Sequence, residues 1–257
     1  MSALVSSKAQ AAQPAAQPNR ESARSFLELK TWYLHNSGEA QAGRVSEYLQ
    51  TGLFPALTRA GAKPVAAFSN LIGPDGPYIV TIVQYPSLAA MEATLAKVAG
   101  DEAHEKASQK LSSGAGMPFV TIESSILHSL AILPEAVLPT DASTRPARIF
   151  ELRTYQSQSM TALNKKAGMF NDGEIAIFQR LGMRPVFIGE SIIGPRQPNI
   201  TYMLSFDNLD GREKHWQQFG SDPAWKALSA PPELKDAEIV AKISNVILRP
   251  LAFSPLR

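Results

Sequence analysis

The sequence predicts an α+β fold made of two tandem ferredoxin-like repeats, each with the element order β-α-β-β-α-β. Three observations lead to this prediction. A motif of alternating apolar and polar residues occurs at 27–32 and returns at 150–155. Glycines and prolines typical of turns recur at a constant spacing of 121 residues, as from Gly61 to Gly182. Within each half, strand-like and helix-like periodicities follow one another in the same order.

The first strand and the first helix are marked by their periodicity. Residues 26–33 alternate apolar and polar side chains, as a half-buried strand does. Residues 42–60 carry apolar side chains at spacings of three and four, which indicates a helix. Pro55 lies inside this pattern and predicts a kink or a break, because proline lacks the N–H that a helix interior requires. Gly61 follows as the expected helix end.

A hairpin and two further helices complete the first half. Residues 65–72 and 78–85 have the composition of strands, and the turn sequence Gly-Pro-Asp-Gly-Pro separates them. Ser87 is placed to cap the helix that follows. The remaining elements are two helices and a final strand, expected at 88–98, 101–111 and 119–131. The second half repeats this order.

Composition and the repeat together predict the domain boundaries. A Pro-rich stretch separates the halves, and an Ala/Gln/Pro-rich stretch precedes them. Ala9-Gln10-Ala11 has the form of a signal-peptidase site, so the leader is either the remnant of an export signal or a plain disordered segment. The first interpretation predicts an exported or periplasmic protein, and the second a cytoplasmic one. We predict a leader, a first repeat, a linker and a second repeat, at residues 1–22, 23–133, 134–147 and 148–257.

Several predicted strands are apolar on both faces, and the strand at 78–85 is the clearest example. A sheet of this kind needs cover on both sides. Helices cover one face, and the sheet of the other half is available for the second. We therefore predict that the two antiparallel sheets pack face to face as an intrachain pseudo-dimeric α+β barrel with all helices outside.

The repeated strand motif supplies the candidate site. In both copies an acid, a base and an aromatic residue alternate with an apolar set. We expect the apolar set, Leu27, Leu29, Phe150 and Leu152, to face the helices, so that the polar set points into the barrel interior. Buried charges must pair or bind something. The expected ligand-binding residues are Glu151, Arg153, Tyr155, Glu28, Lys30 and Trp32.

Two interpretations of these charges stay open. Arg153 is the expected ligand anchor, because its guanidinium can hold a carboxylate through two hydrogen bonds. The alternative is a structural ion pair of Glu151 and Arg153 that bridges the two halves of the barrel.

The histidines predict no metal site. None of the four forms an H-x-x-x-H or H-E-x-x-H pair, so His35, His104, His128 and His215 are expected to be surface or hydrogen-bonded histidines. Nucleotide-binding and nucleophile motifs are absent from the sequence, and no cofactor is predicted. Trp216, Phe219 and Trp225 are expected to pack a short helix on the sheet, with Asp222 and Pro223 at a helix start.

Composition excludes several classes of function. Lys and Arg total 25 against 23 for Asp and Glu, which gives a net charge of +2 and no basic run, so nucleic-acid binding is not expected. The absence of cysteine excludes disulfides, thiolate catalysis and cysteine-ligated metals. No apolar run reaches the length of a membrane span, so no integral membrane segment is predicted.

The strand Glu151-Leu152-Arg153-Thr154-Tyr155 resembles the opening strand of the NIPSNAP domain, whose members begin with a similar E-L-R-T-Y sequence. The resemblance extends through Phe178, Gly182 and Gly194 to the region 216–225, and so covers most of residues 148–251. The first half is a more diverged copy. This resemblance implies a dimeric α+β barrel fold with pseudo-symmetry. It implies no catalytic residues, and the roles proposed for eukaryotic members lie in vesicle traffic and mitochondrial signalling.

Three functional hypotheses remain. The leading one is a NIPSNAP-like barrel protein that binds a small ligand or a protein partner between or beside the two sheets. The second is an oxygenase-like enzyme of the same barrel superfamily, haem-dependent or cofactor-independent, with Arg153 or His128 near the reacting group. The third is a structural protein that assembles into a homo-oligomer.

Overall fold

The computed structural model describes residues 24–36, 40–138 and 146–257. The predicted leader at 1–22 and the centre of the predicted linker lie outside the described residues. Among the described residues, no helix combines the length and the apolar character that crossing a membrane would require.

Eight antiparallel strands form one closed barrel in the order β1-β3-β2-β8-β5-β7-β6-β4. The strands are β1 Phe26–Tyr33, β2 Lys63–Ile72, β3 Tyr78–Tyr85, β4 Thr121–Ser129, β5 Ile149–Gln156, β6 Arg184–Ile193, β7 Asn199–Phe206 and β8 Lys242–Pro250. The predicted barrel is confirmed, but the two sheets do not merely face one another. Hydrogen-bonded ladders between β2 and β8 and between β4 and β6 join them edge to edge, which leaves no free sheet edge among these strands.

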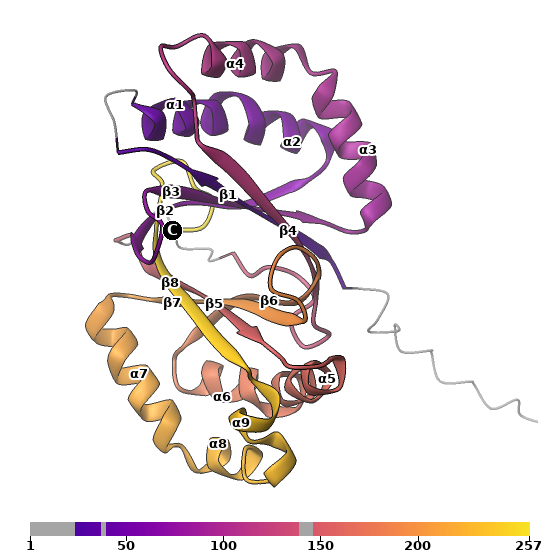
Figure 1. The fold of residues 1–257 in the computed structure, drawn as a ribbon, viewed down its shortest axis with the longest axis vertical. Helices are drawn as coiled ribbons and strands as arrows, with labels where there is room; N and C mark the ends of the chain where they lie inside the picture. The colour runs from indigo at the N-terminus through magenta and orange to yellow at the C-terminus, as the bar shows by residue number, and fades with distance from the viewer. Residues whose placement is uncertain (1–23, 37–39, 139–145) are drawn as a thin grey trace, which may run out of the picture.

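The helices lie outside the barrel in two groups, as Figure 1 shows. The first group covers β1–β4 and consists of α1 Gln41–Tyr48, η2 Leu49–Leu53, α2 Phe54–Ala60, α3 Leu88–Ala99 and α4 Glu102–Ser112. The second group covers β5–β8 and consists of α5 Met160–Met169, η3 Phe170–Glu174, α6 Ile175–Arg180, α7 Leu209–Ser221, α8 Pro223–Leu228, η4 Pro232–Leu234 and α9 Asp236–Ile239. The barrel separates the two groups.

Local sequence signals account for most helix ends. Ser87 caps α3 by accepting a hydrogen bond from the Ala90 backbone N–H, as predicted. Asp222 caps α8, whose first residue is Pro223. Gly61 ends α2 with a φ of 97°, a conformation that glycine adopts without strain.

The predicted break at Pro55 does not occur. The π-helical turn η2 carries the chain from α1 directly into α2, and Pro55 is the second residue of α2. The second group has the same arrangement, with η3 between α5 and α6 and no proline. The proline is therefore not the cause of the π-helical turn.

The orientation of the repeated strand motif is opposite to the sequence-based expectation. Leu27, Leu29 and Phe150 belong to the apolar cluster that fills the barrel, with Leu152 packed against it. The polar set therefore faces outward, toward the helices. This apolar cluster fills the interior beneath the barrel mouth, and close-packed apolar side chains cannot solvate several charges. The layer between sheet and helices supplies hydrogen-bond partners from both.

Candidate functional site

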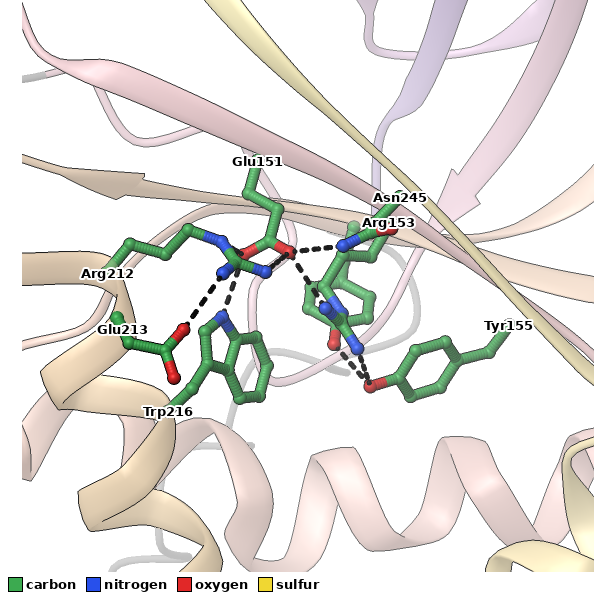
Figure 2. A network of polar contacts seen from close by, with 8 residues as sticks. Glu151, Arg153, Tyr155, Arg212, Glu213, Trp216 and Asn245 are labelled. Atoms are coloured by element: carbon green, nitrogen blue, oxygen red, sulfur yellow. Dashed lines mark hydrogen bonds and ion pairs between the residues drawn. The ribbon is translucent and has the colours of Figure 1, made fainter. Parts of the chain in front are cut away.

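Glu151 is the centre of a buried polar cluster between β5 and α7 (Figure 2). Its carboxylate has no exposed surface and accepts five hydrogen bonds. Arg212 donates two of them, at 2.6 and 3.0 Å. Arg153, Trp216 and Asn245 donate the others, at 2.8, 2.8 and 3.0 Å. Burial alone would raise the pKa of Glu151, but the Arg212 hydrogen bonds and the Arg153 charge outweigh burial and lower it.

Arg153 links this carboxylate to a pair of tyrosines. Its Nη2 donates to the Tyr155 hydroxyl at 3.1 Å, and the Tyr202 hydroxyl donates to the same oxygen at 2.8 Å. The guanidinium also lies 4.3 Å from the centre of the Trp216 ring. Its Nε–H is buried and has no hydrogen-bond partner among the described residues. The two phenols share one hydrogen bond, so one of their two O–H groups also lacks a protein acceptor.

A second buried ion pair lies beside the tyrosines. Lys166 Nζ donates to Glu174 Oε2 at 2.8 Å, and both side chains are almost fully buried. The rings of Tyr155, Phe170 and Trp225 surround Nζ at 4.8 to 5.2 Å from their centres. Burial acts to lower the pKa of Lys166, but the adjacent Glu174 carboxylate outweighs it and raises the pKa. Lys166 therefore stays protonated inside an aromatic cage.

The first half has a simpler cluster at the corresponding place. Glu28 pairs with Lys30 at 2.9 Å and accepts a hydrogen bond from the Tyr85 hydroxyl at 3.2 Å. Trp32 donates from its indole N–H to Thr81 at 3.3 Å. The six predicted site residues thus fall into two clusters on opposite sides of the barrel, and the structure does not bring the two triplets together. The acids of both clusters pair with protein groups, as the structural ion-pair interpretation requires, but neither pair bridges the two halves. Glu28–Lys30 lies within β1 and Glu151–Arg153 within β5.

An open cavity lies instead at one end of the barrel, where β1 and β5 end. Its volume is about 450 Å³, and a smaller hollow of about 90 Å³ adjoins it. Both are lined by Thr31, Tyr33, Val80, Leu152, Thr154 and Arg196. The two halves of the chain contribute equally to this shared set, so the cavity belongs to the barrel as a whole. We call it the barrel-mouth cavity.

The floor of this cavity is apolar and its wall is rich in hydroxyl groups. Val80 and Leu152 belong to or contact the barrel core. The wall carries the side chains of Thr31 and Thr154, and the Thr154 hydroxyl pairs with Thr201 at 2.9 Å. An apolar floor with a few polar groups above it is typical of a small-molecule site.

Tyr78 is the distinctive polar residue of the cavity. Its side chain lines the cavity and is 5% exposed, yet its hydroxyl has no hydrogen-bond partner among the described residues. Burial, with smaller contributions from Tyr33 and Asp75, raises the pKa of Tyr78 to about 12, so the phenol carries its proton at neutral pH. A buried O–H without an acceptor costs stability, which makes it a candidate ligand contact.

Sequence reasoning missed the cavity residues because it assigned the inward face to the wrong side chains. Thr31 and Thr154 continue the alternation of the inward-facing leucines, two residues further along each strand. A threonine at the end of a row of inward-facing apolar residues was the sequence feature that could have predicted the polar wall of the cavity. The burial of Lys166 could also have been predicted, because this charged residue lies on the same helix face of α5 as the apolar residues Ala162, Leu163 and Ala167.

The histidines do not assemble into a site. Among the described residues, no group of three or more metal-binding side chains is suitable for a metal ion. His128 stacks on Phe26 with ring centres 4.6 Å apart, and His104 bonds to the Tyr48 hydroxyl. Neither His35 nor His128 lines the barrel-mouth cavity. The predicted packing of Trp216, Phe219 and Trp225 is confirmed by their edge and tilted contacts with one another and with Phe178.

Two solved structures that share the barrel fold are described as a candidate monooxygenase and as an anthrone oxidase-like protein. A candidate monooxygenase from Lactobacillus acidophilus NCFM is 10% identical, with a TM-score of 0.57, and covers 88% of this chain and 93% of its own. An anthrone oxidase-like protein is 11% identical, with a TM-score of 0.51 and coverages of 89% and 92%. At this identity the likeness establishes the barrel fold alone.

The family comparison concerns the second half. A NIPSNAP family protein of unknown function from Agrobacterium tumefaciens strain C58 is 28% identical over 43% of this chain and 95% of its own, with a TM-score of 0.38. No curated protein matches the chain significantly. The NIPSNAP family model matches residues 150–255, from the strand that carries Glu151 to the end of the C-terminal segment. Residues 150–255 are therefore similar to the NIPSNAP domain.

Proposed function

We propose that this protein binds a small molecule in the barrel-mouth cavity, between the two halves of the chain. The observation that carries the proposal is a cavity of about 450 Å³ whose lining includes Tyr78, a residue with a buried hydroxyl that has no partner among the described residues. A volume in this range accommodates a small ligand, and the buried hydroxyl supplies a directional contact. The Glu151 and Lys166 clusters then act as rigid supports of the second half.

The arrangement of the halves supports this proposal. We infer that residues 23–133 and 148–257 are duplicated ferredoxin-like units joined by the linker 134–147. Both halves have the same order of strands and helices, and each has a π-helical turn after its first helix. A duplicated unit that closes into one barrel places residues of both copies at each end of the barrel, and here the two copies contribute different side chains to the cavity above an apolar core.

The test is a fragment screen by ligand-observed NMR on the purified full chain. We expect binders that lose binding in Thr31→Trp, which fills the cavity from its wall, and that weaken in Tyr78→Phe, which removes one hydroxyl. Thr31→Ser serves as the matched control, because it keeps both hydroxyl and space. If the fragments bind Thr31→Trp and the wild type equally, the cavity is not the binding site.

A second candidate function is oxidation of an aromatic ligand, and the likeness to an anthrone oxidase-like barrel over 89% of the chain favours it. Anthrone is a suitable probe, since its oxidation by dioxygen forms anthraquinone and one water. Oxygen uptake and anthraquinone absorbance would be followed with the purified chain, before and after haem is added. Uptake no faster than in buffer under both conditions would reject this candidate.

A further inference from the structure

The charged residues of the barrel mouth are divided between the two halves. The first half contributes two acids, Asp75 and Glu123, and the second half contributes two bases, Arg196 and Lys242. Asp75 and Arg196 occupy the same place in their hairpin turns, each preceded by Gly-Pro and each in a left-handed conformation with φ of 59° and 61°. Because β2 pairs with β8, the hairpin of Asp75 lies next to the strand that carries Lys242, and because β4 pairs with β6, the hairpin of Arg196 lies next to the strand that carries Glu123. Each side of the mouth therefore carries one acid and one base.

These opposite charges do not neutralise one another. Among the described residues, the side chains of Asp75, Arg196 and Lys242 form no ion pair and no hydrogen bond with other protein groups. Glu123 accepts one hydrogen bond, from the Tyr33 hydroxyl at 3.2 Å. Surface charges are often unpaired, but these four converge on one cavity from both sides. They are free to meet the charges of a ligand.

The first half also contributes two aromatic rings to the mouth. Tyr33 and Tyr78 lie edge to face, with ring centres 5.9 Å apart, and both line the cavity. Burial, Glu123 and Asp75 raise the pKa of Tyr33, while Arg196 opposes them, so both kinds of charge act on this one hydroxyl. Tyrosine rings next to carboxylates attract an ammonium group. The guanidinium of Arg196 and the ammonium group of Lys242, which line the same mouth, attract a carboxylate.

We propose that the ligand of the barrel mouth is a zwitterion of amino-acid type, with its ammonium group at Tyr33 and Asp75 and its carboxylate at Arg196. This inference rests on the proposed function, because it identifies the ligand class of the same cavity. The apolar floor, with Val80 and Leu152, receives the uncharged part of the molecule. The Thr154 and Ser244 hydroxyls also line the cavity and can donate to the carboxylate.

The experiment uses the full chain and isothermal titration with the common L-amino acids and glycine betaine. For the tightest zwitterion, two analogues are then titrated, the amine without the carboxylate and the acid without the ammonium group. We expect each analogue to bind at least about tenfold more weakly, since each loses one charge pair. We also expect affinity to fall as salt rises, because the rim is exposed.

Variants assign the two ends of the ligand. Arg196→Gln is expected to bind the zwitterion no more tightly than the amine analogue that lacks the carboxylate. Asp75→Asn is expected to reduce the difference in affinity between the zwitterion and the acid analogue that lacks the ammonium group. Lys226→Gln, an exposed change on α8 away from the mouth, is the control and is expected to bind as the wild type does.

Two results separate this inference from the proposed function. If fragments bind in the cavity but no zwitterion binds better than its one-charge analogues, the zwitterion is rejected and the binding function stands. If neither fragments nor zwitterions bind, both proposals fail. Equal affinity of the zwitterion for wild type and Arg196→Gln would also overturn the assignment of its carboxylate.

Discussion

Lys166 and Glu174 form an ion pair of 2.8 Å in the second half, and the equivalent places in the first half hold Val45 and Leu53. The equivalence follows from the π-helical turns. Lys166 and Val45 each lie four residues before the turn begins, and Glu174 and Leu53 each end it. One fold position thus accepts either an apolar pair or a buried ion pair.

A double-mutant cycle on this pair tests that conclusion. Lys166→Met and Glu174→Leu are each expected to cost about 3–5 kcal/mol, because each leaves one buried charge unpaired. The double variant restores an apolar pair and is expected to lie close to the wild type in its free energy of unfolding. Urea unfolding followed by tryptophan fluorescence measures all four proteins. Additive losses in the double variant would contradict the prediction.

Glu151→Gln is expected to lower the free energy of unfolding by about 3–5 kcal/mol, since Arg153 and Arg212 lose their shared buried carboxylate. Glu213→Gln is the matched control. Glu213 contacts the same Arg212 at 3.7 Å but is exposed, so its replacement should change stability by no more than about 0.5 kcal/mol. Urea unfolding at neutral pH compares the three proteins, and equal losses in both variants would argue against a central role for Glu151.

The acid stability of the fold should depend on the same carboxylate. The pKa of Glu151 is lower in the folded chain than its ordinary value of 4.5. Its contribution is therefore complete above pH 4.5 and is lost as the pH falls from there through the folded pKa. The stability difference between wild type and Glu151→Gln should shrink over that acidic range. Unfolding curves recorded from neutral pH downward measure it, and a constant difference would refute the linkage.

Loss of the hydroxyl should change the stability of the protein differently at Tyr78 and at Tyr85, the two ends of β3. Tyr78→Phe removes a buried hydroxyl without a partner and should leave the unliganded protein unchanged or more stable by about 1 kcal/mol. Tyr85→Phe removes the donor to buried Glu28 and should cost about 1.5–3 kcal/mol. Thermal unfolding of both variants without ligand gives the comparison. A large loss in Tyr78→Phe would mean that this hydroxyl has a partner such as bound water.

Trp216 packs against Phe178 and also donates a hydrogen bond to Glu151, and a conservative substitution separates these two contributions to stability. Trp216→Phe keeps an aromatic ring near Arg153 and Phe178 but removes the indole N–H that bonds to Glu151 at 2.8 Å. We expect a loss of about 1.5–3 kcal/mol, the usual range for a hydrogen bond to a charged group. Trp225→Phe has no such bond to lose and should cost less. Urea unfolding of the two variants measures the difference.

The sequence by itself determined the order of strands and helices, the capping by Ser87 and Asp222, and the need for a second cover on the sheets. These features depend on local periodicity, on turn residues and on total apolar area, all of which are legible along the chain. It also singled out Glu151, Arg153 and Tyr155 as a unit, and the structure does bring them into one hydrogen-bonded cluster.

Only the tertiary structure decided which face of each strand points inward. Alternation separates two faces but does not say which one meets the core, because both faces of these strands carry large side chains. Closure of eight strands into a narrow barrel selected the leucine face for the interior and sent Glu151 and Arg153 to the helices. The same closure brought Thr31 and Thr154 into the lining of one cavity and created the barrel mouth from segments that are far apart in the sequence.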